Sequence, residues 1–200
     1  MISSVAKIFV ILLSTFLIFI SMFLGGWFIL SVLVIPCLFA NLISLLEVNK
    51  KLKIKGFNSR EELIENSLMK IWPPIQFFLV FGCIISVSWY DHLSITESIS
   101  LFISLGLIVG SIGIPIAHNL IHRDIKADTY LADFLLGMSV YGHYRTEHIL
   151  IHHQYIGTPN DLSTAKYNEN FYNFFSQNLF KKLLLSWKIE KSRLEVLSIS

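Results

Sequence analysis

Residues 71–117 read IWPPIQFFLVFGCIISVSWYDHLSITESISLFISLGLIVGSIGIPIA, and Asp91 and Glu97 are the only charged side chains among them. A membrane-spanning helix needs about 20 apolar residues, so this stretch is long enough to cross a bilayer twice. The polar dipeptide Asp91-His92 lies near its middle, where a turn would divide the two crossings. The stretch therefore predicts a helical hairpin in a membrane.

A second stretch of this kind begins at the amino terminus, where Lys7 is the only charge from Met1 to Leu46. We divide it at Gly25-Gly26, since paired glycines favour a turn. The two stretches together predict four spanning helices, over 5–24, 27–46, 72–90 and 98–117. We place Pro73-Pro74 in the first turn of the third helix, because proline suits a first helical turn better than a helix interior. A secretory signal is the alternative for the first helix.

The composition agrees with a membrane protein. Apolar residues make up 54% of the 200 residues and charged residues 15%, with a mean hydropathy of +0.61. A soluble domain of this length would carry more charge. We predict an all-α, multi-pass integral membrane protein with a single domain. Its parts are a first hairpin over 5–46, a basic loop over 47–70, a second hairpin over 72–117 and a histidine-rich region over 118–200.

The loop over 47–70 sets the expected orientation. It carries six basic residues: Lys50, Lys51, Lys53, Lys55, Arg60 and Lys70. Basic loops stay on the cytoplasmic side, so we expect this loop and residues 118–200 to face the cytoplasm, as in a bacterial inner membrane. The lysine cluster at 50–55 has no interleaved aromatic residue, which argues against nucleic-acid binding. Cys37 and Cys83 fall in different predicted helices and are interpreted as free thiols.

Six of the seven histidines lie in the 36 residues from His118 to His153. Imidazole is a common ligand of iron, copper and zinc, so the cluster predicts a metal site. His118 and His122 are four residues apart, as are His148 and His152, and this spacing places each pair on one face of a helix. His153 would lie roughly 100° further round, an offset that could serve two neighbouring metals.

Three segments then follow a recognisable order. Residues 118–123 read HNLIHR, residues 141–153 read YGHYRTEHILIHH and residues 158–161 read TPND. This set resembles the amino-terminal half of the membrane alkane hydroxylases (alkane 1-monooxygenases), which are non-haem di-iron enzymes of the fatty-acid-desaturase-like superfamily. The resemblance extends over roughly residues 118–195.

The resemblance implies an iron site, with two irons in the full-length family enzyme. By position, the metal ligands would be His118, His122, His148, His152 and His153. It implies no catalytic residue beyond these ligands and no organic cofactor. We expect His143 to pack nearby or to contact a ligand histidine. Glu147 is either such a partner of a ligand or a carboxylate on the helix surface.

The implied reaction is terminal hydroxylation of an alkane with O₂. The substrate would enter from membrane lipid, and rubredoxin with its nicotinamide-dependent reductase would supply electrons. Two other functions remain as alternative hypotheses. One is a membrane fatty-acid desaturase or lipid hydroxylase, which commonly carries a His-x2-His-His box. The other is a non-catalytic membrane protein that retains metal binding.

The sequence also departs from the family. Asn119 stands where the family usually has Glu, so a carboxylate that could orient a ligand becomes an amide. Ile151 stands in place of Gly beside two predicted ligands. The family has further histidine motifs, and no histidine follows His153. We therefore expect a truncated or partial form of a longer enzyme.

Polar and aromatic residues outside the histidine motifs give further expectations. Asp161 or Ser163 would cap a helix after the turn at 158–161. Residues 171–195 mix aromatic and basic side chains at helical spacing, which suggests a helix on the membrane surface. Trp72 and Trp89 would anchor one span at the two membrane interfaces.

Overall fold

The computed structural model describes residues 2–32, 34–35, 38 and 59–197. In this part of the chain the regular elements are helices and there is no strand, as predicted. The chain divides into two compact units, Met1–Ser139 and Val140–Ser200, and each is described by itself.

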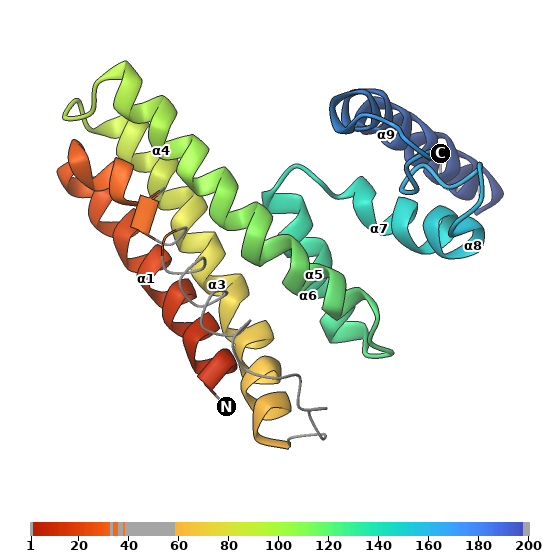
Figure 1. Cartoon of the computed structure of the whole chain (residues 1–200), viewed down its shortest axis with the longest axis horizontal. Coiled ribbons are helices and arrows are strands. Elements are labelled where there is room, and N and C mark those ends of the chain that lie inside the picture. The colour runs from red at the N-terminus through yellow and green to blue at the C-terminus, as the bar shows by residue number, and fades with distance from the viewer. Residues whose placement is uncertain (1, 33, 36–37, 39–58, 198–200) are drawn as a thin grey trace. The chain divides into compact units, whose positions relative to one another are not determined.

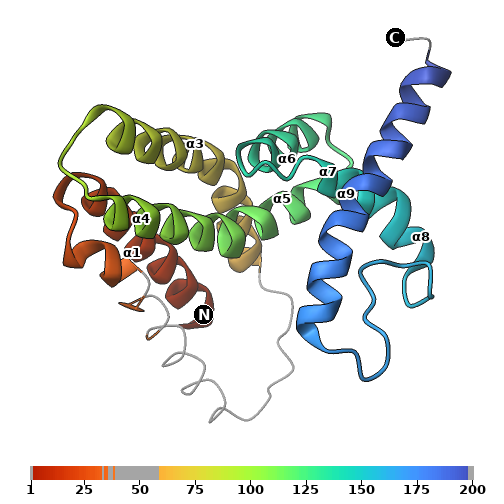
Figure 2. The same cartoon turned by 90° about the horizontal axis from the view of Figure 1, so that it is seen from above.

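The first unit is a bundle of long helices. Its elements are α1 (Ile2–Leu24), α3 (Ser59–Trp89), α4 (Ile95–Ile108), the π-helix η1 (Val109–Gly113), α5 (Ile114–Ile121) and α6 (Lys126–Met138). Helices α1, α3 and α4 lie side by side (Figure 1), and η1 and α5 continue directly from α4 (Figure 2). Helix α6 packs against α5 and α3.

Two helical segments of this unit are long and apolar enough to cross a membrane. They are Glu62–Trp89 and Ile95–Ile121, and α1 adds a shorter apolar segment, Ile8–Leu24. In the predicted helix over 27–46, residues 27–32, 34–35 and 38 are helical, and the other positions lie outside the described residues. The described part of the chain thus contains two candidate spans of the four predicted.

Both predicted turns occur, and side chains join them. Gly25 and Gly26 have φ angles of 59° and 58°, which glycine adopts without strain. The carboxylate of Glu97 accepts a hydrogen bond from the backbone N–H of Gly26. Nε2 of His92 lies 2.8 Å from the carbonyl oxygen of Met22. The end of α1 is therefore held against the turn that precedes α4.

The placement of Pro73-Pro74 at a helix start is wrong. Helix α3 begins at Ser59 and contains both prolines, so residues 59–70 of the predicted loop are helical. A proline removes one backbone hydrogen bond from a helix interior. Membrane helices tolerate this where neighbouring helices pack around the site, and Pro73 is fully buried.

A buried polar contact holds α3 against the other helices. Trp72 Nε1 donates to Gln76 Oε1 at 2.9 Å, and Gln76 Nε2 donates to the carbonyl oxygen of Leu135 on α6 at 3.1 Å. Gly113 of η1 leaves room for this amide, because a Cβ there would lie 2.1 Å from Gln76 Oε1. Trp72 is fully buried, so its ring packs against protein and does not face lipid as an interface anchor would. Trp89 is 80% exposed.

An ion pair fixes the turn between α5 and α6. Arg123 Nη1 lies 3.1 Å from Oδ2 of Asp128, a buried carboxylate on α6. The same guanidinium donates to the side-chain oxygen of Asn66 on α3. Burial in this way is unfavourable for a carboxylate unless it is paired. Arg123 therefore ties the chain after α5 to two other helices.

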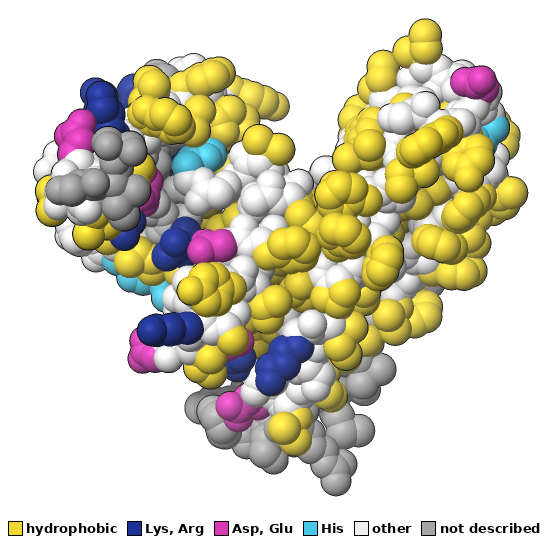
Figure 3. All heavy atoms as spheres, turned by 180° about the vertical axis from the view of Figure 1, so that it is seen from behind, with side chains coloured by type: hydrophobic (Ala, Val, Ile, Leu, Met, Phe, Trp, Pro, Cys, Tyr) yellow, Lys and Arg dark blue, Asp and Glu magenta, His cyan; other side chains and the backbone are white. Residues whose placement is uncertain are grey.

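The surface of the first unit is rich in apolar side chains. Figure 3 shows hydrophobic side chains gathered over the helices of the bundle. Large exposed residues include Phe9, Phe16 and Phe23 of α1, Phe78 of α3, and Ile103 and Leu107 of α4. Contiguous apolar surface of this kind suits contact with lipid.

The second unit carries the second histidine motif. Its elements are α7 (His143–Glu147), the π-helix η2 (His148–His152), α8 (His153–Tyr155) and α9 (Phe171–Val196). Helix α9 packs against α7. The hydroxyl of Thr146 donates to Glu190, and the Glu147 carboxylate lies 3.5 Å from Lys182 Nζ, so two polar contacts join these helices.

Candidate metal centre

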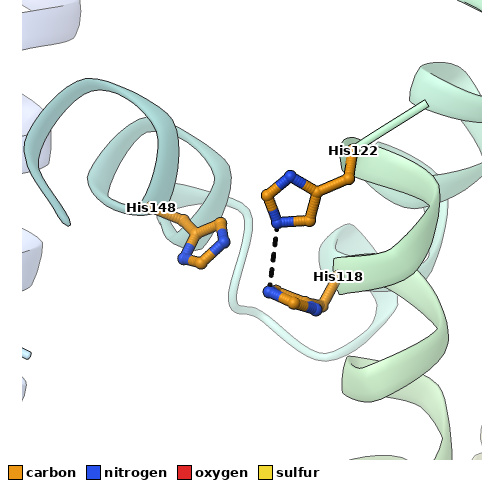
Figure 4. Close-up of side chains that lie close together, drawn as sticks. All are labelled: His118, His122 and His148. Atoms are coloured by element: carbon orange, nitrogen blue, oxygen red, sulfur yellow. Dashed lines mark hydrogen bonds between the residues drawn. The ribbon is translucent and has the colours of Figure 1, made fainter. Parts of the chain in front are cut away.

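The first histidine pair lies at the end of α5. His118 is on the last turn and His122 caps the helix. Their Nε2 atoms are 3.2 Å apart and their ring centroids 4.6 Å apart (Figure 4). The four-residue spacing predicted that the two rings share a face, and the structure places them together.

The second motif does not form the regular α-helix that was predicted. The chain is α-helical to Glu147, then follows the π pattern from His148 to His152, and returns to an α turn at His153. Hydrogen bonds from residue i to i+5 widen a π turn, so side chains five residues apart approach each other. Nε2 of His148 consequently lies 3.1 Å from Nε2 of His153. His153 was predicted about 100° further round the helix than His152, and the π turn instead brings its ring closer to His148, with centroids 4.6 Å apart, than to His152, at 5.9 Å.

The nitrogen separations suit metal ligation. Two imidazoles bound to one ion through bonds of about 2.1 Å place their nitrogens about 3.0 Å apart at a right angle and about 3.4 Å apart at a tetrahedral angle. The His118–His122 and His148–His153 distances, 3.2 and 3.1 Å, lie within this range. Each pair could therefore supply two ligands to one ion. In the metal-free protein the same distances allow an N–H···N hydrogen bond.

His152 makes a different contact. Its Nδ1 lies 3.0 and 3.1 Å from the two carboxylate oxygens of Asp161. The Asp161 side chain is fully buried, whereas that of His152 is 21% exposed. The predicted turn at 158–161 is present, with Asp161 N donating to the carbonyl oxygen of Thr158 at 3.1 Å. The expected role as a helix cap is wrong, because Asn170 caps α9.

Hydrogen bonds stabilise the ionised form of Asp161. Burial by itself would raise the pKa of this carboxyl. The Thr164 hydroxyl, the Ser163 backbone N–H and the His152 ring lower it, and the pKa lies below its usual value. The carboxylate therefore faces His152 as an acceptor.

Glu147 is not a surface carboxylate, because its side chain is only 1% exposed. It accepts a hydrogen bond from the Ser163 hydroxyl at 2.9 Å and pairs with Lys182 at 3.5 Å. Lys182 Nζ also donates to the Ser163 hydroxyl oxygen at 2.7 Å. Glu147 therefore links the histidine motif to α9 and to the segment that carries Asp161.

Aromatic rings surround the start of the second motif. The Tyr144 ring stacks on His148, with centroids 5.1 Å apart, and His143 meets Tyr141 edge-on at 4.7 Å. Burial raises the pKa of Tyr144 to about 12, so its phenol stays neutral. Burial also lowers the pKa of His143, although Glu147 opposes this shift. A neutral, packed His143 agrees with a supporting role.

The two departures from the alkane hydroxylase pattern lie in different surroundings. Ile151 is buried, with 3% of its surface exposed, so its branched side chain forms part of the core. Asn119 is exposed on α5. Replacement of Gly by Ile is therefore accommodated by packing within the folded chain.

Sequence reasoning missed the partner of His152, and it missed the Gln76 contact that holds α3, η1 and α6. From the sequence, Asp161 was expected only to cap a helix. The available signal was the position of Asp161 in a Thr-Pro-x-Asp turn, two residues before Ser163. Asp side chains in turns commonly accept a hydrogen bond from the backbone two residues further on. The signal for Gln76 was its position as a lone amide in an apolar run. Burial of an amide is unfavourable in free energy unless the amide is hydrogen-bonded.

Comparison with known proteins identifies the class. The chain belongs to the fatty acid desaturase family, whose model matches residues 98–198. This region includes both histidine motifs. Curated relatives carry the name predicted from those motifs, alkane 1-monooxygenase, which confirms the resemblance.

Three relatives illustrate the extent of the match. Alkane 1-monooxygenase 2 of Alcanivorax borkumensis is 34% identical over 93 residues, which cover 46% of this chain and 24% of that protein. Its namesake in Pseudomonas aeruginosa is 32% identical over 93 residues, with 46% and 25% covered. Alkane 1-monooxygenase of Acinetobacter baylyi is 33% identical over 129 residues, with 64% and 31% covered. The chain thus spans about a quarter to a third of these relatives.

Proposed function

We propose that this chain supplies histidine ligands to the iron centre of an alkane 1-monooxygenase. The two Nε2 pairs carry the proposal, because each has the separation that two ligands of one ion require. The names of the curated relatives supply the reaction class. The reaction would be terminal hydroxylation of an alkane with O₂.

The proposed ligands are His118, His122, His148, His152 and His153. Iron bound by them would supply activation of O₂ and attack on an unactivated C–H bond. The chain itself would orient the ligands: Asp161 contacts His152, and Arg123 and Gln76 hold the helices around α5. Two irons in the complete site would follow the family resemblance.

The surroundings of the site are also part of the proposal. We place the chain in a membrane with several crossings and with both histidine motifs on the cytoplasmic side, as the basic loop favours. The apolar helices would admit a hydrocarbon from the lipid. Rubredoxin and its reductase would deliver electrons at the cytoplasmic surface.

Product analysis tests the reaction. The chain would be loaded with ferrous iron in lipid nanodiscs and supplied with a linear alkane, O₂, rubredoxin and reductase. A terminal alcohol that depends on His148 and His122 supports the proposal. Bound iron without O₂ consumption would instead assign this chain to metal binding alone.

A desaturase or lipid hydroxylase is the second candidate, because the matching family model describes fatty acid desaturases. The two enzymes differ in product and not in ligand chemistry. Acyl lipid from the same nanodiscs should therefore be examined for new double bonds and hydroxyl groups. Their appearance, with alkane unchanged, would favour this candidate.

A further inference from the structure

The buried carboxylate of Asp161 contacts the ring of His152 in a defined orientation. Both carboxylate oxygens face Nδ1 of the ring, at 3.0 and 3.1 Å. The carboxylate side chain has no exposed surface. A buried carboxylate is costly unless its oxygens receive hydrogen bonds, so this position needs an explanation.

The carboxylate cannot readily turn away from the ring. Its Oδ1 accepts from the backbone N–H of Ser163 at 2.8 Å, and its Oδ2 accepts from the hydroxyl of Thr164. The Thr164 hydroxyl oxygen also accepts from the backbone N–H of Gly157 at 3.3 Å. These bonds close the turn on itself and fix the direction of the carboxylate.

A second attachment holds this turn to the histidine motif. Ser163 lies between Asp161 and Thr164 on the same turn, and its hydroxyl group bonds Glu147 and Lys182. Glu147 directly precedes His148 in the chain. The turn is therefore anchored at the beginning of η2 through Glu147 and at its end through His152.

The chemistry of this contact selects one form of the ring. An ionised carboxylate only accepts hydrogen bonds, so Nδ1 of His152 must carry the proton. A neutral imidazole has one ring proton, which leaves Nε2 with a free electron pair. Nε2 is also the atom through which His148 and His153 approach each other.

We propose that Asp161 is a positioning residue that holds His152 as the Nδ1–H tautomer and so presents Nε2 to the metal. The proposal rests on the proposed function, in which His152 is a ligand. Asp161 itself would not touch the metal. It would act through the ring, as carboxylates behind metal-bound histidines do.

Asp161→Asn tests the direction of the hydrogen bond. The amide keeps the size of the side chain. The Ser163 N–H holds its oxygen at the Oδ1 position, so its NH₂ group takes the Oδ2 position, 3.0 Å from Nδ1, where it donates to Nδ1 and favours the ring proton on Nε2, which blocks coordination. Partners of this type change metal affinity by about 10–100-fold. We expect the dissociation constant for Fe²⁺ to rise by about that factor. Glu169→Gln is the matched control, because it removes the same charge from a carboxylate that accepts from Lys166 N at 2.8 Å.

Two further measurements keep the proposal testable if Asp161→Asn folds poorly. Thr164→Val removes one bond to the carboxylate and leaves Asp161 in place, so we expect a smaller loss of affinity in the same direction. In the metal-free wild-type chain, ¹⁵N NMR of labelled histidine reports the tautomer directly. The signal of His152 is identified by its loss in His152→Gln.

The outcomes separate this proposal from the proposed function. A protonated Nδ1 in the wild type together with weaker Fe²⁺ binding in Asp161→Asn supports it. A protonated Nε2 in the wild type, or equal Fe²⁺ binding in wild type and Asp161→Asn, would overturn it. Failure of the wild type to bind Fe²⁺ would contradict the proposed function, while the tautomer measurement would still decide the role of Asp161.

Discussion

His148 and His153 are five residues apart, and their Nε2 atoms lie 3.1 Å from each other. The π-helix His148–His152 produces this approach, because its turn is wider than an α turn. π turns occur often at functional sites. Here the wider turn brings together two histidines that a regular α-helix would point in different directions.

The pairing predicts how substitutions at these histidines combine. If one ion joins the two rings, His148→Ala and His153→Ala should each lower Fe²⁺ occupancy, and the double variant should lose little more than either single variant. Occupancy would be measured by metal analysis after dialysis against a weak chelator. His92→Ala is the control, since His92 contacts the Met22 carbonyl far along the chain from the motifs. Additive losses would show that the two rings act independently.

Gly113→Ala should destabilise the first unit by about 1–3 kcal/mol, the usual cost of overpacking a core. The added Cβ would lie 2.1 Å from Gln76 Oε1, and hydrogen bonds to Trp72 and Leu135 hold that amide in place. Gly110→Ala is the matched control in the same π-helix, because a Cβ there meets nothing within 4 Å. Thermal unfolding in detergent would compare them. Equal unfolding midpoints would refute the close contact.

Lys182→Met should destabilise the second unit by about 1–3 kcal/mol, because it leaves the buried Glu147 without its cationic partner. Adding Glu147→Gln to the same chain should restore part of the loss. Lys188→Met removes a charge from an exposed position on the same helix and should have little effect. Chemical unfolding followed by circular dichroism would measure these differences. A similar loss in both lysine variants would rule out the specific pairing.

The proposed orientation predicts which side of the membrane each turn faces. In a chain with Cys37 and Cys83 replaced by Ala, a cysteine at Asp91 should react with an impermeant reagent added outside intact cells. A cysteine introduced by Arg60→Cys should react only after the cells are permeabilised, since the basic segment is expected in the cytoplasm. The reverse pattern of labelling would invert the topology.

The long apolar runs made the helical class predictable, because few charges interrupt them and glycine or Asp-His marks each turn. The histidine motifs made the family predictable, since their order and spacing are specific. The interior position of Pro73-Pro74 was not predictable in the same way. A proline weakens any helix, and only packing around Trp72 and Gln76 decides whether the helix continues.

The detailed geometry of the candidate site could not be predicted from the sequence either. No residue type marks a π turn, so the approach of His148 to His153 depends on the backbone hydrogen-bond register. The contact of Asp161 with His152 depends on how a turn folds back over nine residues. Both features arise from tertiary structure, whereas the residue spacing alone describes an ideal α-helix.

The proposed function requires that the histidines of both motifs bind iron. Fe²⁺ titration of the chain in nanodiscs, with the bound iron counted per chain, tests it most directly in wild type, His122→Ala and His148→Ala. We predict tight binding by the wild type and a clear loss in each variant, because one ligand is removed from each motif. Equal iron binding in all three proteins would contradict the claim.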